Sequence, residues 1–276
     1  MSNPLYREIL QDIRALVEAE AHPRRRTIRL SPEVAAKLEA LPSSQPAASA
    51  ADSLSGTAEP EPQPEASASP ATGGDETPGP DPETRRAALD ALEKTVSMCT
   101  KCELHETRTQ TVFADGDPMA RIVFVGEAPG GEEDRQGVPF VGRAGQLLTD
   151  IITKGMGLRR EEVYICNVIK CRPPNNRDPK PAEIEQCEPY LVEQLRLVQP
   201  EVICALGAHA ARTLLRTNVA VGKLRGQWHE YCGIPLRVTY HPSYLLRNPA
   251  DKRKTWEDIQ VIMEHLGLPV PRGKGS

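Results

Sequence analysis

The chain has 276 residues, of which 39% are hydrophobic and 4% aromatic, and its formal net charge is −4 at pH 7. This length holds one large domain or two small ones and is enough to bury a substantial core. No apolar run approaches the ~20 residues that span a bilayer, and the N-terminus lacks the basic-then-apolar layout of a secretion signal. The composition therefore excludes membrane-spanning and secreted proteins, and we expect a cytoplasmic one.

The acidic balance belongs to the N-terminal part of the chain. Residues 1–83 carry seven Lys and Arg against 14 Asp and Glu, whereas the rest of the chain carries 27 against 24. The remainder is therefore weakly basic. Such a small positive charge is weak support for a nucleic-acid partner, and from charge alone an ordinary solvated surface is the better explanation.

Two short amphipathic helices are predicted within residues 1–41. In residues 3–20 the apolar side chains recur at helical spacing. Ser31 followed by Pro32 is typical of an N-cap and a proline at the first helical position, and it predicts a second helix that ends near Leu41. The two helices could dock on a partner protein, on the main domain or on each other, and they indicate no chemistry.

Residues 42–82 are predicted to form a disordered linker. They are mostly Pro, Ala, Ser, Glu and Gly, with Leu54 as the one large aliphatic residue and no aromatic residue. Such a stretch cannot bury enough apolar surface to offset the conformational entropy lost on folding. The folded domain is therefore expected at residues 83–270, with a short tail at 271–276.

The folded part shows alternating helix and strand patterns. A helix is predicted at 83–98 from its strong helix formers. Four short runs rich in β-branched residues, with little alternation, predict strands buried on both faces. These strands are expected at 121–126, 163–170, 202–207 and 236–240, with helices at 144–154, 181–198 and 208–215. The pattern favours an α/β fold with three layers, αβα, around a central and mainly parallel four-stranded sheet, outside which lies the helical and disordered N-terminal extension.

Four of the seven cysteines indicate a metal centre. Cys99 and Cys102 form a C-x-x-C pair, and Cys171 and Cys187 lie outside every obvious apolar run. Thiolates are soft ligands that favour zinc or iron-sulfur clusters, and the spacing leaves both open. The other three cysteines lie in or beside apolar segments and are interpreted as core residues. They are Cys166, Cys204 and Cys232.

Ligands of parallel sheets bind beyond the carboxyl ends of the strands, where this chain has polar segments. The first predicted strand runs into GEAPGGEED at 126–134, whose glycines allow close approach of a ligand but which lacks the Gly-Lys-Ser/Thr ending of a phosphate-binding loop. The second strand delivers Asn167 beside the basic loop KCRPPNNR at 170–177. The fourth leads to His241, which Pro242 stiffens as a hydrogen-bond donor for a cleft.

Together these motifs resemble the family 4 uracil-DNA glycosylases, the iron-sulfur type. The similar stretches are GEAPG plus ED, GVPFVGRAGQLL, N-x-x-K-C-R-P-P-x-N-R and HPSYLLR, together with the four spaced cysteines, within residues 96–268. The resemblance implies a monomeric hydrolase that cleaves the N-glycosidic bond of deoxyuridine in single- and double-stranded DNA and initiates base excision repair. It also implies a place in the bacterial cytosol, at the nucleoid.

The resemblance assigns roles in the reaction to particular residues. Phe140 would stack on the flipped uracil, Asn167 would read its Watson-Crick edge, and His241 would donate to uracil O2 as negative charge develops there. Ala128, in the uracil-binding segment, stands where better-known uracil-DNA glycosylases carry Asp. Glu127 is therefore the candidate for positioning or activating water, with Asn167 or a backbone carbonyl as the substitute. Ordering of the loop is the alternative role of Glu127.

Further residues would contact the base and the DNA strand. Glu133 would help to form the wall near uracil C5, where the methyl group of thymine must be refused. Ser243 and Arg247 would contact phosphates, and Leu245 or Leu246 would fill the space left by the flipped base. The resemblance also implies that the four cysteines hold a structural 4Fe-4S cluster.

Two other classes of function remain open at this stage. One is a uracil-DNA binding protein that does not turn over, or that traps the sugar covalently. The intact His241 and the KCRPPNNR loop argue against it. The other is a metal-stabilised DNA-binding adaptor whose N-terminal helices bind a partner; its zinc form would be colourless, whereas an iron-sulfur protein is brown.

Overall fold

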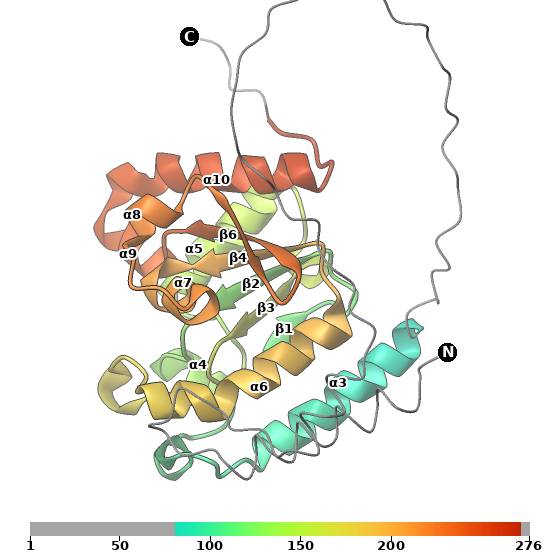
Figure 1. Cartoon of the computed structure of the whole chain (residues 1–276), viewed down its shortest axis with the longest axis vertical. Helices are drawn as coiled ribbons and strands as arrows, with labels where there is room; N and C mark the ends of the chain where they lie inside the picture. Colours follow the sequence, from blue (N-terminus) through green and yellow to red (C-terminus); the bar gives the residue numbers. More distant parts are fainter. Residues whose placement is uncertain (1–80, 272–276) are drawn as a thin grey trace, which may run out of the picture. The chain divides into compact units, whose positions relative to one another are not determined.

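A computed structural model of the chain describes residues 81–271 (Figure 1). The helices predicted within 1–41, and the predicted linker apart from its last two residues, lie outside this range, as do residues 272–276 of the predicted tail. The first described helix, α3 (Pro82–Ser97), begins one residue earlier than predicted, and the Asp81 carboxylate caps it by accepting from the main-chain N–H groups of Glu83 and Thr84. No helix in the described range is long and apolar enough to cross a membrane.

Six strands form one mixed sheet in the order β1-β3-β2-β4-β6-β5. The four central strands pair in parallel, and the two edge strands pair antiparallel with their neighbours. The strands are β1 (Ala114–Gly116), β2 (Ile122–Gly126), β3 (Tyr164–Asn167), β4 (Val202–Leu206), β5 (Trp228–Tyr231) and β6 (Ile234–Thr239). The predicted α/β fold with four central parallel strands is confirmed.

The two edge strands were not predicted, and in each case there is a physical reason why the sequence did not reveal the strand. β1 contains only Ala, Asp and Gly, which give no apolar signal. β5 is partly exposed along its whole length, so it lacks the continuous apolar run of the central strands. Edge strands of this kind are held in the sheet by hydrogen bonds to the neighbouring strand rather than by burial of their own side chains.

Helices cover both faces of the sheet. After α3 come α4 (Gly131–Gln136), α5 (Arg143–Asp150), α6 (Pro181–Val198), α7 (Gly207–Leu215), α8 (Val221–Leu224), α9 (Pro242–Arg247) and α10 (Lys252–His265). The π-helical turn η2 (Ile151–Met156) extends α5, and short 3-10 turns lie at η1 (Glu103–Glu106), η3 (Arg160–Glu162), η4 (Pro174–Asn176) and η5 (Pro249–Asp251). The helices predicted at 181–198 and 208–215 therefore coincide with α6 and α7 within one residue.

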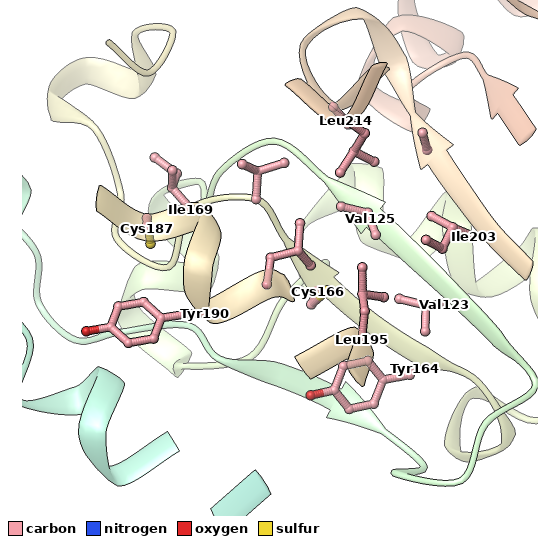
Figure 2. Close-up of a cluster of buried hydrophobic side chains, with 14 of the residues drawn as sticks. Val123, Val125, Tyr164, Cys166, Ile169, Cys187, Tyr190, Leu195, Ile203 and Leu214 are labelled. Atoms are coloured by element: carbon pink, nitrogen blue, oxygen red, sulfur yellow. The ribbon is translucent and has the colours of Figure 1, made fainter. Parts of the chain in front are cut away.

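Alternate residues of β2, β3 and β4 supply two separate cores. In β2, Val123 and Val125 point to the core under α3, α6 and α7, whereas Ile122 and Phe124 point to the core under α5 and α10. Figure 2 shows the first of these cores, with Cys187 beside Ile169 at its margin. Burial on both faces explains why these strands read as continuous apolar runs.

Candidate functional site

A cavity of about 390 Å³ opens at the carboxyl ends of β2, β3 and β6. All of the residues predicted to act in catalysis or to bind the base line it, and so does Ser243. They are Glu127, Ala128, Glu133, Phe140, Asn167 and His241, and the cavity that they line is called the base cavity after its predicted ligand. The structure therefore brings together side chains that are separated by more than 100 residues along the chain.

Gly126, the last residue of β2, makes room for the side chains of Asn167 and Phe140. It pairs with Asn167 at the end of β3. A side-chain carbon at position 126 would lie 2.3 Å from Asn167 Oδ1 and 2.6 Å from Phe140 Cζ. Glycine is required here because the amide and the aromatic ring both occupy the space above this strand end.

Phe140 is held in a backbone conformation that costs free energy. Its φ is +53°, a left-handed value that a side chain disfavours by about 1–2 kcal/mol. Two contacts hold this loop in place: α5 approaches it at Gly145, where a side-chain carbon would lie 1.8 Å from the Phe140 carbonyl oxygen, and Arg160 donates to the Pro139 carbonyl at 2.7 Å. The result is a buried ring whose centroid lies 5.6 Å from that of His241.

His241 caps α9 and has a defined tautomer. Its Nδ1 accepts from the main-chain N–H of Ser243 at 3.1 Å and lies 2.8 Å from Ser243 Oγ. The proton therefore resides on Nε2. The pKa of His241 is lowered to about 4, mainly by burial, with Arg247 and His209 contributing in the same direction. The ring is neutral at physiological pH and presents one N–H donor.

Glu127 is a partly buried carboxyl group with an unusual protonation equilibrium. Its pKa is raised to about 7, mainly by burial and also by nearby Asp178, while Arg212 opposes the rise. His209 lies between the two acids, with Nδ1 3.4 Å from Glu127 Oε1 and Nε2 3.5 Å from Asp178 Oδ1. This carboxyl group is thus poised to change charge near neutral pH.

Sequence reasoning missed His209 and Asp178. His209 lies at the start of α7, two residues after the Gly207 that follows β4, so it stands at the same carboxyl edge of the sheet as the predicted site residues. Asp178 follows the basic loop. The edge position of a histidine directly after a predicted strand could have identified the first of these, but no comparable signal exists for the second.

A larger hollow of about 1110 Å³ lies beside the base cavity, between α6, α7 and the turn that joins β5 to β6. It shares Glu127 with that cavity and is also lined by His209, but none of Phe140, Asn167 and His241 lines it. Size does not decide between the two hollows. We place the chemistry in the smaller one because the aromatic ring, the amide and the imidazole meet there.

The residues predicted to contact the DNA strand are distributed over α9. Ser243 bonds to His241 and so orients the imidazole. Leu246 is 38% exposed and Arg247 lies exposed at the end of the helix, whereas Leu245 is 1% exposed. Leu245 packs beneath α9, so of the two leucines predicted to fill the space left by the base, Leu246 is the one exposed at the surface.

The four cysteines of the predicted metal centre line one small hollow between the end of α3, the segment after β3, and α6. The thiols of Cys171 and Cys187 are buried, and all four are unpaired. Arg108 Nη1 donates to Cys171 Sγ at 3.1 Å, and the main-chain N–H of Lys170 donates to Cys187 Sγ at 3.2 Å. The hollow therefore already contains donors directed at two of its sulfurs.

The remaining three cysteines do not all behave as predicted. Cys166 in β3 and Cys204 in β4 are fully buried. Cys232 is exposed, because it occupies the turn between β5 and β6 with a φ of +52°. The interpretation of Cys232 as a core residue is therefore wrong: the residue stands in the turn that leads from the edge strand β5 into β6, where its side chain is exposed.

Comparison with known proteins points to one family. The model of the uracil DNA glycosylase superfamily matches residues 113–260, a range that includes every residue of the base cavity discussed above. The chain is 47% identical over 184 residues to a type-4 uracil-DNA glycosylase of Thermotoga maritima, which covers 64% of this chain and 94% of that protein.

Two archaeal proteins give similar matches. The type-4 uracil-DNA glycosylase of Archaeoglobus fulgidus is 43% identical over 192 residues, 67% of this chain and 96% of that protein. The type-4 uracil-DNA glycosylase of Saccharolobus solfataricus is 43% identical over 187 residues, 64% of this chain and 86% of that protein. The relatives are thus matched over almost their whole length, which leaves about a third of this chain outside the similarity.

Proposed function

The chain belongs to the type-4 uracil-DNA glycosylases of the uracil DNA glycosylase superfamily, and we propose that it hydrolyses the N-glycosidic bond of deoxyuridine in single- and double-stranded DNA and so initiates base excision repair. The single observation that supports this most is the meeting of Phe140, Asn167 and His241 in one cavity. A binding protein without turnover, or a metal-stabilised adaptor, would not need a neutral imidazole aimed into that cavity.

Base recognition would use the ring and the amide. The cavity of about 390 Å³ lies within the range of small-ligand sites, and the base enters it by flipping, at a cost of a few kcal/mol in duplex DNA. Phe140 offers a π-face to the flipped base. The Asn167 amide can both donate and accept, so it matches the edge of uracil and meets cytosine with the opposite pattern. Glu133 and Ala128 complete the wall.

Departure of the base would be assisted by His241. As the glycosidic bond breaks, positive charge develops on the sugar and negative charge on uracil, so donors fixed in advance should contribute most of the stabilisation. Nδ1 of His241 is occupied by Ser243, which leaves the Nε2–H group free to donate to uracil O2. A neutral donor suffices for this step, in agreement with the lowered pKa of the ring.

Glu127 would position or activate the attacking water. Ala128 cannot do so, because it has no polar side-chain atom. The raised pKa of Glu127 makes its carboxylate a better proton acceptor than an ordinary glutamate at neutral pH. The transition state of this reaction is expected to be strongly dissociative, so the contribution of such a base is smaller than that of the leaving-group donor.

Contacts with the DNA strand would come from α9. Arg247 is placed to meet a phosphate, and Leu246 is the exposed apolar side chain that could fill the space left by the base. Ser243 could add a phosphate contact while it orients His241. Phosphate contacts make the affinity for DNA decrease as salt concentration rises. A DNA substrate also leads us to expect the protein wherever the genome lies, in a bacterium at the nucleoid.

The cysteine hollow fits a metal cluster better than a single zinc ion. Four thiolates around one zinc at a Zn–S distance of about 2.3 Å would lie about 3.8 Å from one another. In residues 81–271, no three cysteine sulfurs all lie within 4.8 Å of one another. The sulfurs are therefore spaced more widely than around a single zinc ion, and this spacing suits a 4Fe-4S cluster held by Cys99, Cys102, Cys171 and Cys187. When bound, such a cluster would cross-link α3, the basic loop and α6.

The test is excision of uracil by the purified full-length chain. A labelled oligonucleotide with a single uracil, single-stranded or paired, should be cut after alkali treatment with no added cofactor or divalent metal, whereas matched oligonucleotides with cytosine or thymine should stay intact. The preparation should be brown and contain close to four irons per chain. Absence of cleavage by fully iron-loaded protein would end the proposal of an enzyme.

A further inference from the structure

Lys170 connects the cysteine centre to the base cavity. It is 1% exposed, and it lines the cysteine hollow but not the cavity. Its main-chain N–H donates to Cys187 Sγ at 3.2 Å, and its carbonyl accepts from Val112 N–H at 2.8 Å. Its Nζ donates to the main-chain carbonyl of Asn167 at 2.7 Å. One residue thus bonds to a metal-centre cysteine with its backbone and to the base-reading residue with its side chain.

Burial of this ammonium is costly and needs a reason. Within residues 81–271, no carboxylate forms an ion pair with Lys170. Its surroundings are the Asn167 carbonyl, the Phe113 ring at 5.9 Å from Nζ, and the sulfurs of Cys166 and Cys187. A buried charge without a charged partner is kept in a protein only where its position matters or where several weaker contacts replace the lost hydration. Here the strongest of those contacts ends on Asn167.

The bonded carbonyl lies where the chain leaves the sheet. Asn167 is the last residue of β3, and beyond it the main-chain N–H groups of Val168 and Ile169 donate to the carbonyls of Gly126 at 3.0 Å and Glu127 at 3.1 Å. The peptide between Asn167 and Val168 is held on both sides, by the bond from Val168 N–H to the Gly126 carbonyl and by the bond from Lys170 Nζ to the Asn167 carbonyl. Together these bonds fix the main chain at Asn167, from which the amide side chain projects with its Oδ1 above Gly126 in the cavity. The position of the amide therefore depends in part on an ammonium anchored beside Cys171 and Cys187.

We propose that Lys170 is a positioning residue for base recognition: it fixes the amide of Asn167 and transmits the rigidity of the cysteine centre to the base cavity. This inference rests on the proposed function, since it concerns the same cavity. Loss of the Lys170 bond should loosen the fit of uracil without removing any group that touches it. Misplacement of a recognition group by about 1 Å costs about 10²-fold in rate.

The decisive variant is Lys170→Met, which keeps the length and the apolar stem of the side chain but cannot donate. We expect the single-turnover rate on uracil to fall 10- to 100-fold, free uracil to inhibit at least tenfold less well, and the ratio of uracil to cytosine cleavage to narrow. Iron content, the visible spectrum and the unfolding temperature should stay close to those of the wild type. Lys170→Gln, whose shorter amide cannot reach the same carbonyl, should behave in the same way.

A matched control exists in the same hollow. Lys101 lines it with Nζ 4.8 Å from the Tyr190 ring centroid, but it forms no described bond to Asn167. Lys101→Met should leave rate, uracil inhibition and selectivity unchanged. Wild-type values for both Lys170 variants would overturn the inference. Losses of rate and selectivity that run parallel to a loss of iron in all three variants would also overturn it. So would failure of both Lys170 variants to load iron, because each of these results would assign Lys170 a purely structural role.

Failure of the two proposals can be distinguished. If the iron-loaded wild type does not cut uracil-containing DNA, the proposed function fails. Binding of free uracil by calorimetry, measured on the same samples, would still compare Lys170→Met with the wild type. Weaker uracil binding by the variant supports the role of Lys170 in holding the amide, and equal binding overturns it.

Discussion

The base cavity and the cysteine centre are linked through Lys170, but they are assembled differently. The cavity takes its side chains from short segments that follow parallel strands, and its key groups are a ring, an amide and a neutral imidazole. The centre takes its thiols from α3's end, from the segment after β3 and from α6, three elements that otherwise touch through apolar packing. The first arrangement places the candidate catalytic and binding side chains at one edge of the sheet, and the second joins the elements that surround that edge.

This difference predicts that the two regions respond differently to substitution. Changes of the polar cavity side chains should alter the rate and leave stability almost untouched, because these side chains belong to neither core. Phe140, which also packs in the second core, is the exception. Changes in the centre should alter stability first and activity only as a consequence. Variants of each region, measured for both properties, can confirm or break this division.

The largest effect on rate is expected from His241→Ala. Loss of one fixed donor at a site of developing charge costs about 10²–10³-fold, or roughly 2.7–4 kcal/mol of transition-state stabilisation. Single-turnover cleavage should fall by that amount, while DNA affinity in a gel-shift assay and the unfolding temperature change little. His265→Ala is the control, since that ring lies against Trp228 and away from the cavity. Full activity of the His241 variant would remove it from the mechanism.

For the cysteine centre we expect the opposite pattern from Cys187→Ser. Serine is a poor ligand for iron, so the visible spectrum should be lost. The free energy of unfolding should fall by about 4–5 kcal/mol, because the binding energy of a structural metal site is also folding energy. Cys232→Ser, at the exposed turn, should change neither the colour nor the stability. Thermal unfolding with iron analysis checks both variants, and a colourless variant with wild-type stability would refute a structural role for the centre.

The division also explains how much could be predicted from sequence. Motifs that directly follow apolar strands, such as the one around Asn167, could be placed because the carboxyl ends of parallel strands share one edge. The strand predicted at 163–170 ends three residues early, at Asn167, because Val168 to Lys170 are buried by contacts beyond the ladder. Burial alone cannot distinguish such a segment from a strand.

Contacts between elements were the part that sequence did not reveal. His209 approaches Glu127 only because α7 starts beside the end of β2, and Lys170 reaches Asn167 through a turn whose shape no periodicity encodes. The exposed position of Cys232 and the burial of Leu245 have the same origin, since each depends on which face a neighbouring element covers. These residues could be found only from the assembled sheet.

A smaller effect on rate, but a larger one on selectivity, is expected from Asn167→Asp. The carboxylate loses the N–H donors of the amide, so uracil excision should fall about 10²-fold, or roughly 2.7 kcal/mol, while cytosine gains relative to uracil. Parallel assays on uracil- and cytosine-containing strands measure the ratio. Asn248→Asp, at an exposed position after α9, is the matched control. Unchanged selectivity would mean that another group reads the base.

The smallest effect concerns Glu127 and is best seen in the pH dependence. The pKa of Glu127 is raised to about 7 and that of His241 is lowered to about 4. Of these two groups, Glu127 is therefore the one that should change charge between pH 5 and 9. Because the ionised carboxylate is the proton acceptor, the rate should rise about tenfold through pH 7, and Glu127→Gln should abolish this rise and remain at the low-pH rate. Asp178→Asn removes a like charge and should shift the midpoint of the rise to lower pH, by a modest amount since Asp178 is 75% exposed. A rise centred near pH 4 in the wild type, or one that survives in Glu127→Gln, would assign the titration to His241 or to another group.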